Sequence, residues 1–202
     1  MGTTSRDYNM DVSVQIILLV INVLGTLDID YLIGGSFAST AYGRIRTTQD
    51  VDIIASIEPS HVDPLIKQLD SAFYLDEGMI RNAITRQTTF NMIHLETMFK
   101  VDIFLPKDRP FDQNQLARRV KQVIDKDTSQ EVYFASPEDT ILAKLEWYRS
   151  GGEISEVQWR DIKGVLRQRG DQLEKAYLNK SAQAMQTADL LERCLEEIRH
   201  SL

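Results

Sequence analysis

The segment Asp50-Val51-Asp52-Ile53-Ile54 sets two carboxylates two positions apart within a run of β-branched residues. Such residues favour strands, and side chains two positions apart in a strand point to the same face of a sheet. The pattern therefore predicts a strand over residues 50–55 with both acids on one face and their Cα atoms about 6.6 Å apart. Two carboxylates at that spacing can hold one or two divalent cations between them.

Short strand and helix patterns surround this segment. We predict a helix over residues 12–24, capped by Asp11, and a strand over residues 31–33 that stops at Gly34-Gly35. Further along the chain the patterns predict helices over 36–42 and 60–69, and strands over 90–95 and 99–105 that form a hairpin. Residues 71–90 are ambiguous between a strand near residues 73–75 and a short helix.

The second half of the chain has the start and stop signals of several successive helices. Apolar residues at helical spacing predict a helix after Pro110 that includes residues 116–124, and residues 132–134 predict a short strand. Helices then begin at Ser136, Ser155 and Asp171, each with an acid or amide three residues later as in a capping box, and a last helix follows over residues 190–198. We predict an α/β core over residues 1–110, with a short mixed sheet and flanking helices, and a C-terminal helical part over residues 111–202 packed on it.

Charge and cysteine content exclude some classes of protein. The chain has 23 Lys and Arg against 30 Asp and Glu, a net charge of −7, which argues against a protein that coats nucleic acid. A single cysteine, Cys194, excludes an internal disulfide and fits a reducing compartment. The longest apolar run, residues 16–21, is too short to span a membrane and has no signal-peptide flanks, so we expect a cytoplasmic protein.

A third acid lies in another apolar segment. Asp102 stands between Val101 and Ile103, where an unpaired buried charge would cost several kcal/mol, so we expect it to face a cleft or a metal ion. The alternative for each of these acids is a charge on an edge strand that prevents aggregation.

Two more segments have residues suited to phosphates. Gly34-Gly35-Ser36 lies where a strand passes into a helix, and such a turn lets backbone N–H groups approach an anion while Ser36 caps the helix or contacts a phosphate. Before Asp50, a cluster of cations and hydroxyls is formed by Arg44, Arg46, Thr47 and Thr48. The alternative for that cluster is a solvated loop.

Taken in order, Gly34-Gly35-Ser36, Arg46-x-Thr48-x-Asp50-Val51-Asp52 and Lys100-Val101-Asp102 resemble the nucleotidyltransferase superfamily. Within it, the chain is similar to small bacterial nucleotidyltransferase-like proteins related to toxin components of abortive-infection systems. That similarity extends to Ser136-Pro137-Glu138-Asp139, to Lys144-Leu145 and to Gln158-Trp159-Arg160-Asp161. Lys144 matches a lysine that meets the nucleotide in that group; the alternative is a lysine whose stem covers an apolar helix face.

The resemblance implies metal-dependent transfer of a nucleoside monophosphate from an NTP to an acceptor hydroxyl. Asp50, Asp52 and Asp102 would hold Mg²⁺, with Mn²⁺ as an alternative, and Asp102 would also serve as the base. The nucleotide contacts that the resemblance implies are Gly34, Gly35, Ser36, Arg46, Thr48 and Lys144. The acceptor stays open between tRNA, protein and a small molecule, and an antitoxin is a further expected partner.

Two other functions fit the same residues. One is a catalytically silent protein of this fold that binds nucleotide or regulates a partner. The other is a metal-dependent phosphoesterase, which is disfavoured because histidines are lacking near the three acids.

Overall fold

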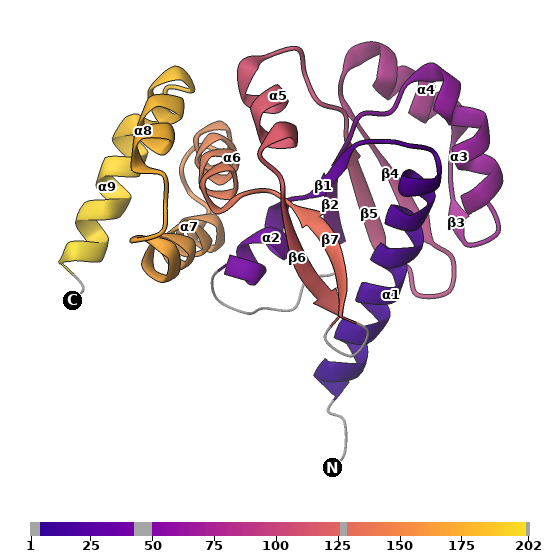
Figure 1. Ribbon diagram of the computed structural model, residues 1–202, viewed down its shortest axis with the longest axis horizontal. Coiled ribbons are helices and arrows are strands. Elements are labelled where there is room, and N and C mark those ends of the chain that lie inside the picture. The colour runs from indigo at the N-terminus through magenta and orange to yellow at the C-terminus, as the bar shows by residue number, and fades with distance from the viewer. Residues whose placement is uncertain (1–4, 43–49, 126–128, 201–202) are drawn as a thin grey trace. The chain divides into compact units, whose positions relative to one another are not determined.

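The computed structural model describes residues 5–42, 50–125 and 129–200 (Figure 1). The strands are β1 (Tyr31–Ile33), β2 (Asp50–Ala55), β3 (Phe73–Tyr74), β4 (Thr89–His94), β5 (Lys100–Phe104), β6 (Val120–Asp125) and β7 (Gln130–Phe134). The helices are α1 (Ser5–Thr26), α2 (Gly35–Tyr42), α3 (Val62–Leu69), α4 (Glu77–Arg86), α5 (Pro110–Ala117), α6 (Pro137–Ser150), α7 (Glu156–Arg169), α8 (Lys175–Ala184) and α9 (Ala188–Arg199), with a 3-10 turn at Pro59–His61. Among the residues that the structure describes, no helix is both long and apolar enough to cross a membrane.

The chain divides into two compact units. The sheet unit comprises Met1–Ile33 and Thr47–Phe134, and the helical unit comprises Gly34–Arg46 and Ala135–Leu202. The sheet unit therefore includes β6 and β7, beyond the boundary at residue 110 that we expected, and α2 belongs with the C-terminal helices although it follows β1 directly in the chain.

The strands that the structure describes in the sheet unit form one seven-stranded mixed sheet in the order β3-β4-β5-β2-β1-β7-β6. β2 pairs in parallel with β5 and antiparallel with β1, while β4 pairs antiparallel with β5 as a hairpin. β7 lies parallel to β1 and antiparallel to β6. The mixed α/β fold predicted from the sequence is confirmed, as are the strands over residues 31–33 and 50–55 and the hairpin.

One face of the central strands is apolar and buried, because their side chains alternate between the two faces of the sheet. The buried residues on that face are Val51, Ile53 and Ala55 of β2, Val101 and Ile103 of β5, and Phe90 and Met92 of β4. α4 contacts β4, and α3 contacts both α4 and α1, beside the β3–β4–β5 end of the sheet (Figure 1). α1 buries the helical stripe Ile16, Ile17, Val20, Ile21 and Leu24.

The helical unit has well-defined helix starts. The hydroxyl of Ser136 accepts a hydrogen bond from the backbone N–H of Asp139 (3.1 Å), as expected for an N-cap, and it donates to the Asp139 carboxylate (2.8 Å). Tyr177 donates to the other oxygen of Asp139 (2.7 Å), whose side chain is fully buried. Ser155 caps α7 through the N–H of Gln158. The predicted starts of α6 and α7 are therefore confirmed.

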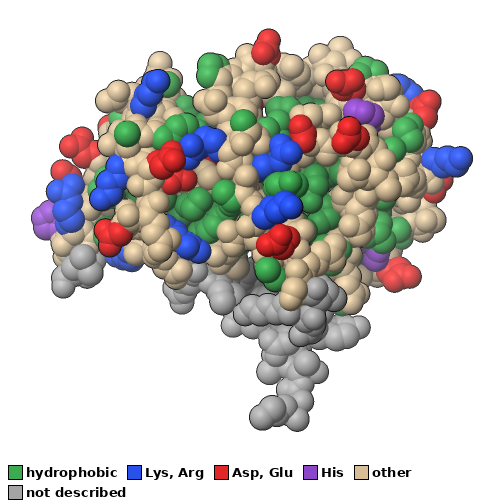
Figure 2. Space-filling view, viewed as in Figure 1, with side chains coloured by type: hydrophobic (Ala, Val, Ile, Leu, Met, Phe, Trp, Pro, Cys, Tyr) green, Lys and Arg blue, Asp and Glu red, His purple; other side chains and the backbone are tan. Residues whose placement is uncertain are grey.

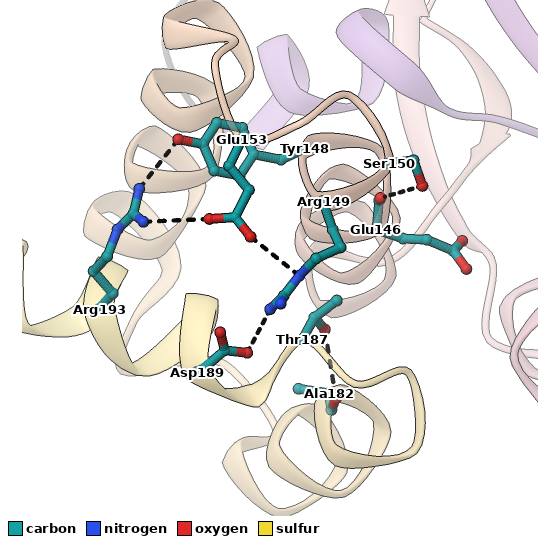
Figure 3. A network of polar contacts seen from close by, with 9 residues as sticks. All are labelled: Glu146, Tyr148, Arg149, Ser150, Glu153, Ala182, Thr187, Asp189 and Arg193. Atoms are coloured by element: carbon teal, nitrogen blue, oxygen red, sulfur yellow. Dashed lines mark hydrogen bonds and ion pairs between the residues drawn. The ribbon is translucent and has the colours of Figure 1, made fainter.

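A polar network joins α9 to the end of α6 (Figure 3). Arg149 forms ion pairs with Glu153 and Asp189. Arg193 of α9 forms an ion pair with Glu153 (3.6 Å) and donates to the hydroxyl of Tyr148 (3.1 Å). These contacts lie at partly exposed positions, so they orient the helices more than they stabilise them.

Three predictions of secondary structure are wrong or displaced. Residues 120–125 form strand β6 rather than a helix, because antiparallel pairing with β7 uses their β-branched residues and leaves Val123 50% exposed instead of on an apolar helix face. α1 begins at Ser5, so Asp11 lies within the helix instead of capping it. α8 begins at Lys175 rather than at Asp171. The ambiguous residues 71–90 contain both a short strand, β3, and a helix, α4.

Charged groups of both signs are interspersed on the face drawn in Figure 2.

Candidate functional site

The pairing of β2 with β5 brings two of the predicted acids side by side. Asp52 is the register partner of Asp102 in this parallel pair, so both side chains leave the same face of the sheet from strands about 4.8 Å apart. Asp50, two positions before Asp52, lies on the same face. All three acids are half-buried. The sequence-based expectation that Asp50 and Asp52 share a face is met, and Asp102 joins them.

Two further polar residues share this face. Lys100 is the register partner of Asp50, and Asn91 of β4 is the register partner of Asp102. The five residues Asp50, Asp52, Lys100, Asp102 and Asn91 are called the acidic face below. Lys100 could have been predicted on this face from the sequence, because it lies two positions before Asp102 in the same strand. Asn91 has no comparable signal, because its place depends on the register of the hairpin.

Lys100 forms a close ion pair within the acidic face. Its Nζ lies 2.7 Å from Oδ2 of Asp102, and the two side chains are 44% and 14% exposed. The hydrogen bond to Asp102, together with the charges of Asp102, Asp50 and Asp52, raises the pKa of Lys100 above its ordinary value. Lys100 therefore stays protonated and neutralises part of the charge of the three acids.

The donor atoms of the acidic face suit Mg²⁺. Carboxylate oxygens are the hard ligands that this ion prefers, and it is commonly bound by one or two carboxylates with substrate phosphates and water completing the octahedron. Among the described residues, no group of three or more His, Cys, Asp and Glu side chains is arranged to hold a metal ion by itself. The in-register pair Asp52 and Asp102 fits a Mg²⁺ ion that is bound by one or two carboxylates, with the substrate supplying the remaining ligands.

The Gly-Gly-Ser turn opens α2 in the helical unit. Gly35 has a positive φ of 54°, a conformation that L side chains rarely adopt, so glycine is needed at this position. The carbonyl of Gly34 accepts the N–H of Ala38 (3.0 Å), which closes the first turn of the helix. The predicted strand–turn–helix context of Gly34-Gly35-Ser36 is therefore present, whereas its contact with phosphate stays a prediction.

Lys144 has a partner inside the helical unit. Its Nζ lies 3.0 Å from Oδ2 of Asp161, and both side chains are only 9% exposed. The hydroxyl of Ser39 on α2 lies 3.4 Å from the same oxygen and donates to the carbonyl of Ser36 (3.0 Å). The ion pair and the Ser39 hydroxyl therefore link α6 and α7 to the first turn of α2. The contact of Lys144 with a nucleotide stays a prediction.

Trp159 and Tyr148 pack as a stacked pair, with ring centroids 4.9 Å apart, and both are buried. The guanidinium of Arg193 covers the Trp159 ring at 4.2 Å. Trp159 therefore serves the core of the helical unit. The remaining predicted contacts, Arg46 and Thr48, lie outside the described residues, as do Arg44 and Thr47.

Comparisons with known proteins point to one fold. No protein-family model and no curated protein matches the chain. ANT(2'')-Ia in complex with adenylyl-2''-tobramycin is 13% identical, with a TM-score of 0.57 over 87% of this chain and 97% of that chain. The solution structure of the antibiotic-resistance factor ANT(2'')-Ia is likewise 13% identical, with a TM-score of 0.55 over 95% and 98% of the two chains.

An antigenic nucleotidyltransferase-like protein from Paracoccidioides brasiliensis is 20% identical, with a TM-score of 0.53 over 91% of this chain and 92% of that chain. At these identities the likeness establishes the fold and not the activity. The mixed α/β arrangement with its seven-stranded sheet is similar to these structures, so the chain has the nucleotidyltransferase fold.

Proposed function

We propose that the protein transfers a nucleoside monophosphate from an NTP to an acceptor hydroxyl, with Mg²⁺ held at the acidic face. The observation that carries this proposal is the register of β2 and β5, which sets Asp52 beside Asp102 with Asp50 on the same face. The nucleotidyltransferase fold of the chain supports it.

The reaction requires the acceptor oxygen to bond to the α-phosphorus while the bond from that phosphorus to the oxygen bridging to the β-phosphate breaks. Pyrophosphate leaves with the bonding electrons, and the hydroxyl proton passes to a base. Bound Mg²⁺ supplies charge neutralisation at the phosphates and lowers the pKa of the acceptor hydroxyl. Asp50, Asp52 and Asp102 would hold the ion, and an oxygen of Asp102 would also accept the proton of the hydroxyl.

The other nucleotide contacts in this proposal come from the sequence resemblance. A contact of the triphosphate with Gly34, Gly35 and Ser36 is one of these predicted contacts, because backbone N–H groups at the start of a helix attract anions. Arg46, Thr48 and Lys144 remain predicted contacts. The bacterial origin, the link to abortive-infection systems and an antitoxin partner likewise stay predictions.

A hydroxyl of a small molecule is the first acceptor to test. ANT(2'')-Ia has been solved with adenylyl-2''-tobramycin, an adenylylated small molecule, and its fold covers most of this chain. The net charge of −7 also disfavours a large RNA footprint. Proteins and tRNA form the second and third arms of the test.

A catalytically silent protein of the same fold is the second candidate. The observation in its favour is the ion pair between Lys100 and Asp102, which engages an oxygen that the proposed reaction needs. Such a protein would bind NTP without transferring the nucleotide.

The test is incubation with each NTP labelled at the α-phosphate, in the presence of Mg²⁺ and pooled aminoglycosides, total tRNA or total protein. We expect label on one acceptor class for the wild type and loss of transfer in Asp52→Asn with an unchanged far-UV circular dichroism spectrum. Asp63→Asn is the matched control, because Asp63 is an 80% exposed acid on α3. Label retained on NTP without transfer would favour the silent protein, and release of labelled nucleotide to water would favour a phosphoesterase.

A further inference from the structure

Lys100 lies between acids on both of its sides in the acidic face. It is level with Asp50 on the neighbouring strand and two positions from Asp102 on its own strand. Its ammonium contacts Oδ2 of Asp102 at 2.7 Å, a distance typical of a charge-assisted hydrogen bond. A positive charge thus lies where a cation bound by Asp102 would lie.

The two partners of this ion pair differ in their access to water. The Asp102 side chain is 14% exposed, so its carboxylate depends on a positive partner. The Lys100 side chain is 44% exposed and has a flexible four-carbon stem, so its ammonium can leave the carboxylate and be hydrated at little cost. The pair can therefore open by movement of Lys100 while Asp102 stays in place.

We propose that Lys100 is a resident counter-ion of the acidic face, which a divalent cation must displace from Asp102 in order to bind. This inference rests on the proposed function, because it takes the acidic face as the metal site. Lys100 then weakens the binding of free metal. It favours a metal ion that arrives with a nucleotide, because the phosphates offer the displaced ammonium a new anionic partner.

The ammonium of Lys100 places its charge directly against the Asp102 carboxylate. Its charge also lessens the mutual repulsion of Asp50, Asp52 and Asp102 when no metal is bound. Loss of this charge should therefore lower the stability of the metal-free protein and at the same time tighten metal binding. A purely structural ion pair would change the first quantity and not the second.

The test is a titration of the full chain with Mn²⁺ alone, followed by electron paramagnetic resonance of the free ion. Five proteins are compared: the wild type, Lys100→Gln, Lys100→Arg, Asp52→Asn and the control Lys121→Gln. Lys121 is an exposed lysine on β6, separated from β5 by three strands, so the control removes the same charge from the same unit. Far-UV circular dichroism checks the fold of each variant.

We expect the Kd for Mn²⁺ to fall about tenfold in Lys100→Gln, toward the lower end of the range for hydrogen bonds to charged groups because Lys100 is half-exposed. Lys100→Arg and Lys121→Gln should stay within about twofold of the wild type, since the first keeps the charge in place and the second removes a screened one. In chelator, Lys100→Gln should melt below the wild type.

An equal or higher Kd in Lys100→Gln than in the wild type would overturn the inference and leave the proposed function standing. An equal fall in the Kd for Mn²⁺ in Lys121→Gln would also overturn it, because the effect would then come from the net charge of the protein and not from the position of Lys100. Saturable Mn²⁺ binding that Asp52→Asn does not weaken would instead contradict the acidic face as the metal site, and so the proposed function.

Discussion

The buried ion pair between Lys144 and Asp161 allows a quantitative prediction. Replacement of Lys144 by methionine keeps most of the side-chain volume and removes the charge that lies 3.0 Å from Oδ2 of Asp161, where both side chains are only 9% exposed. Removal of one partner of a buried pair typically lowers the free energy of unfolding by about 3–5 kcal/mol. We expect a loss in that range for Lys144→Met.

The double variant Lys144→Met/Asp161→Leu should recover most of that loss, because it removes both charges of the buried pair. Urea unfolding followed by circular dichroism gives the free energies, and urea is preferred because a denaturant salt would screen the charges. Lys163→Met is the matched control: Lys163 lies 3.0 Å from Glu197, the same distance, but the two side chains are 23% and 41% exposed.

For that exposed pair we expect a change of about 1 kcal/mol or less. A loss below about 1 kcal/mol for Lys144→Met would refute the reasoning, because it would show that the Lys144–Asp161 pair is as well solvated as a surface pair. A double variant as unstable as the single one would refute it too, since the cost would then come from lost packing rather than from the broken ion pair.

The remaining predictions concern three other side chains. Asp102→Asn should lose most of the rise in melting temperature that Mg²⁺ or Mn²⁺ gives the wild type in a thermal-shift series, because metal stabilises only the state that binds it; identical responses would remove Asp102 from the site. Burial raises the pKa of Cys194, the single cysteine, to about 12, so iodoacetamide at pH 8 should label it in urea and not in the native protein; rapid native labelling would contradict the burial of this α9 side chain. The hydrogen bond from Trp159, followed by that from Lys163, lowers the pKa of Glu197 below its ordinary value of 4.5. Its stabilisation is thus present above pH 4.5 and lost as the pH falls through the lower folded value, so Glu197→Gln should unfold less steeply with acid, whereas an unchanged acid transition would show that the contact has no energetic role.

Much of the sheet could be predicted because its strands have local signals. The β-branched residues of 50–55 and the glycines after Ile33 identify elements from a few neighbours in sequence. β6 was mistaken for a helix because Leu116, Val120 and Ile124 also fit a helical period, and only pairing with β7, which comes later in the chain, decides between the two.

In the acidic face, too, some relations follow from local sequence and others from the pairing of distant strands. Asp50 and Asp52 are related by a two-residue period that the sequence displays, and Lys100 and Asp102 are related in the same way. The alignment of the two pairs depends on the register of β2 against β5, and the place of Asn91 depends on that of β4. Register is set by the packing of the buried face and not by local pattern, so Asp102 could be grouped with Asp50 and Asp52 only through the family resemblance, and Asn91 could not be placed at all.

The membership of α2 in the helical unit has a consequence for synthesis of the protein in the cell. Ser39 of α2 and its partner Asp161 are 122 positions apart in the chain. At about 5–20 residues per second, roughly 6–24 s pass between the emergence of the two from the ribosome. During this interval the strands of the sheet unit can emerge and pair. The face of α2 that α6 and α7 later cover, formed by Ala38, Ser39 and Tyr42, stays uncovered. Nascent chains stalled between residues 135 and 155 should therefore expose α2 to chaperones and proteases, and release of the full chain should protect it.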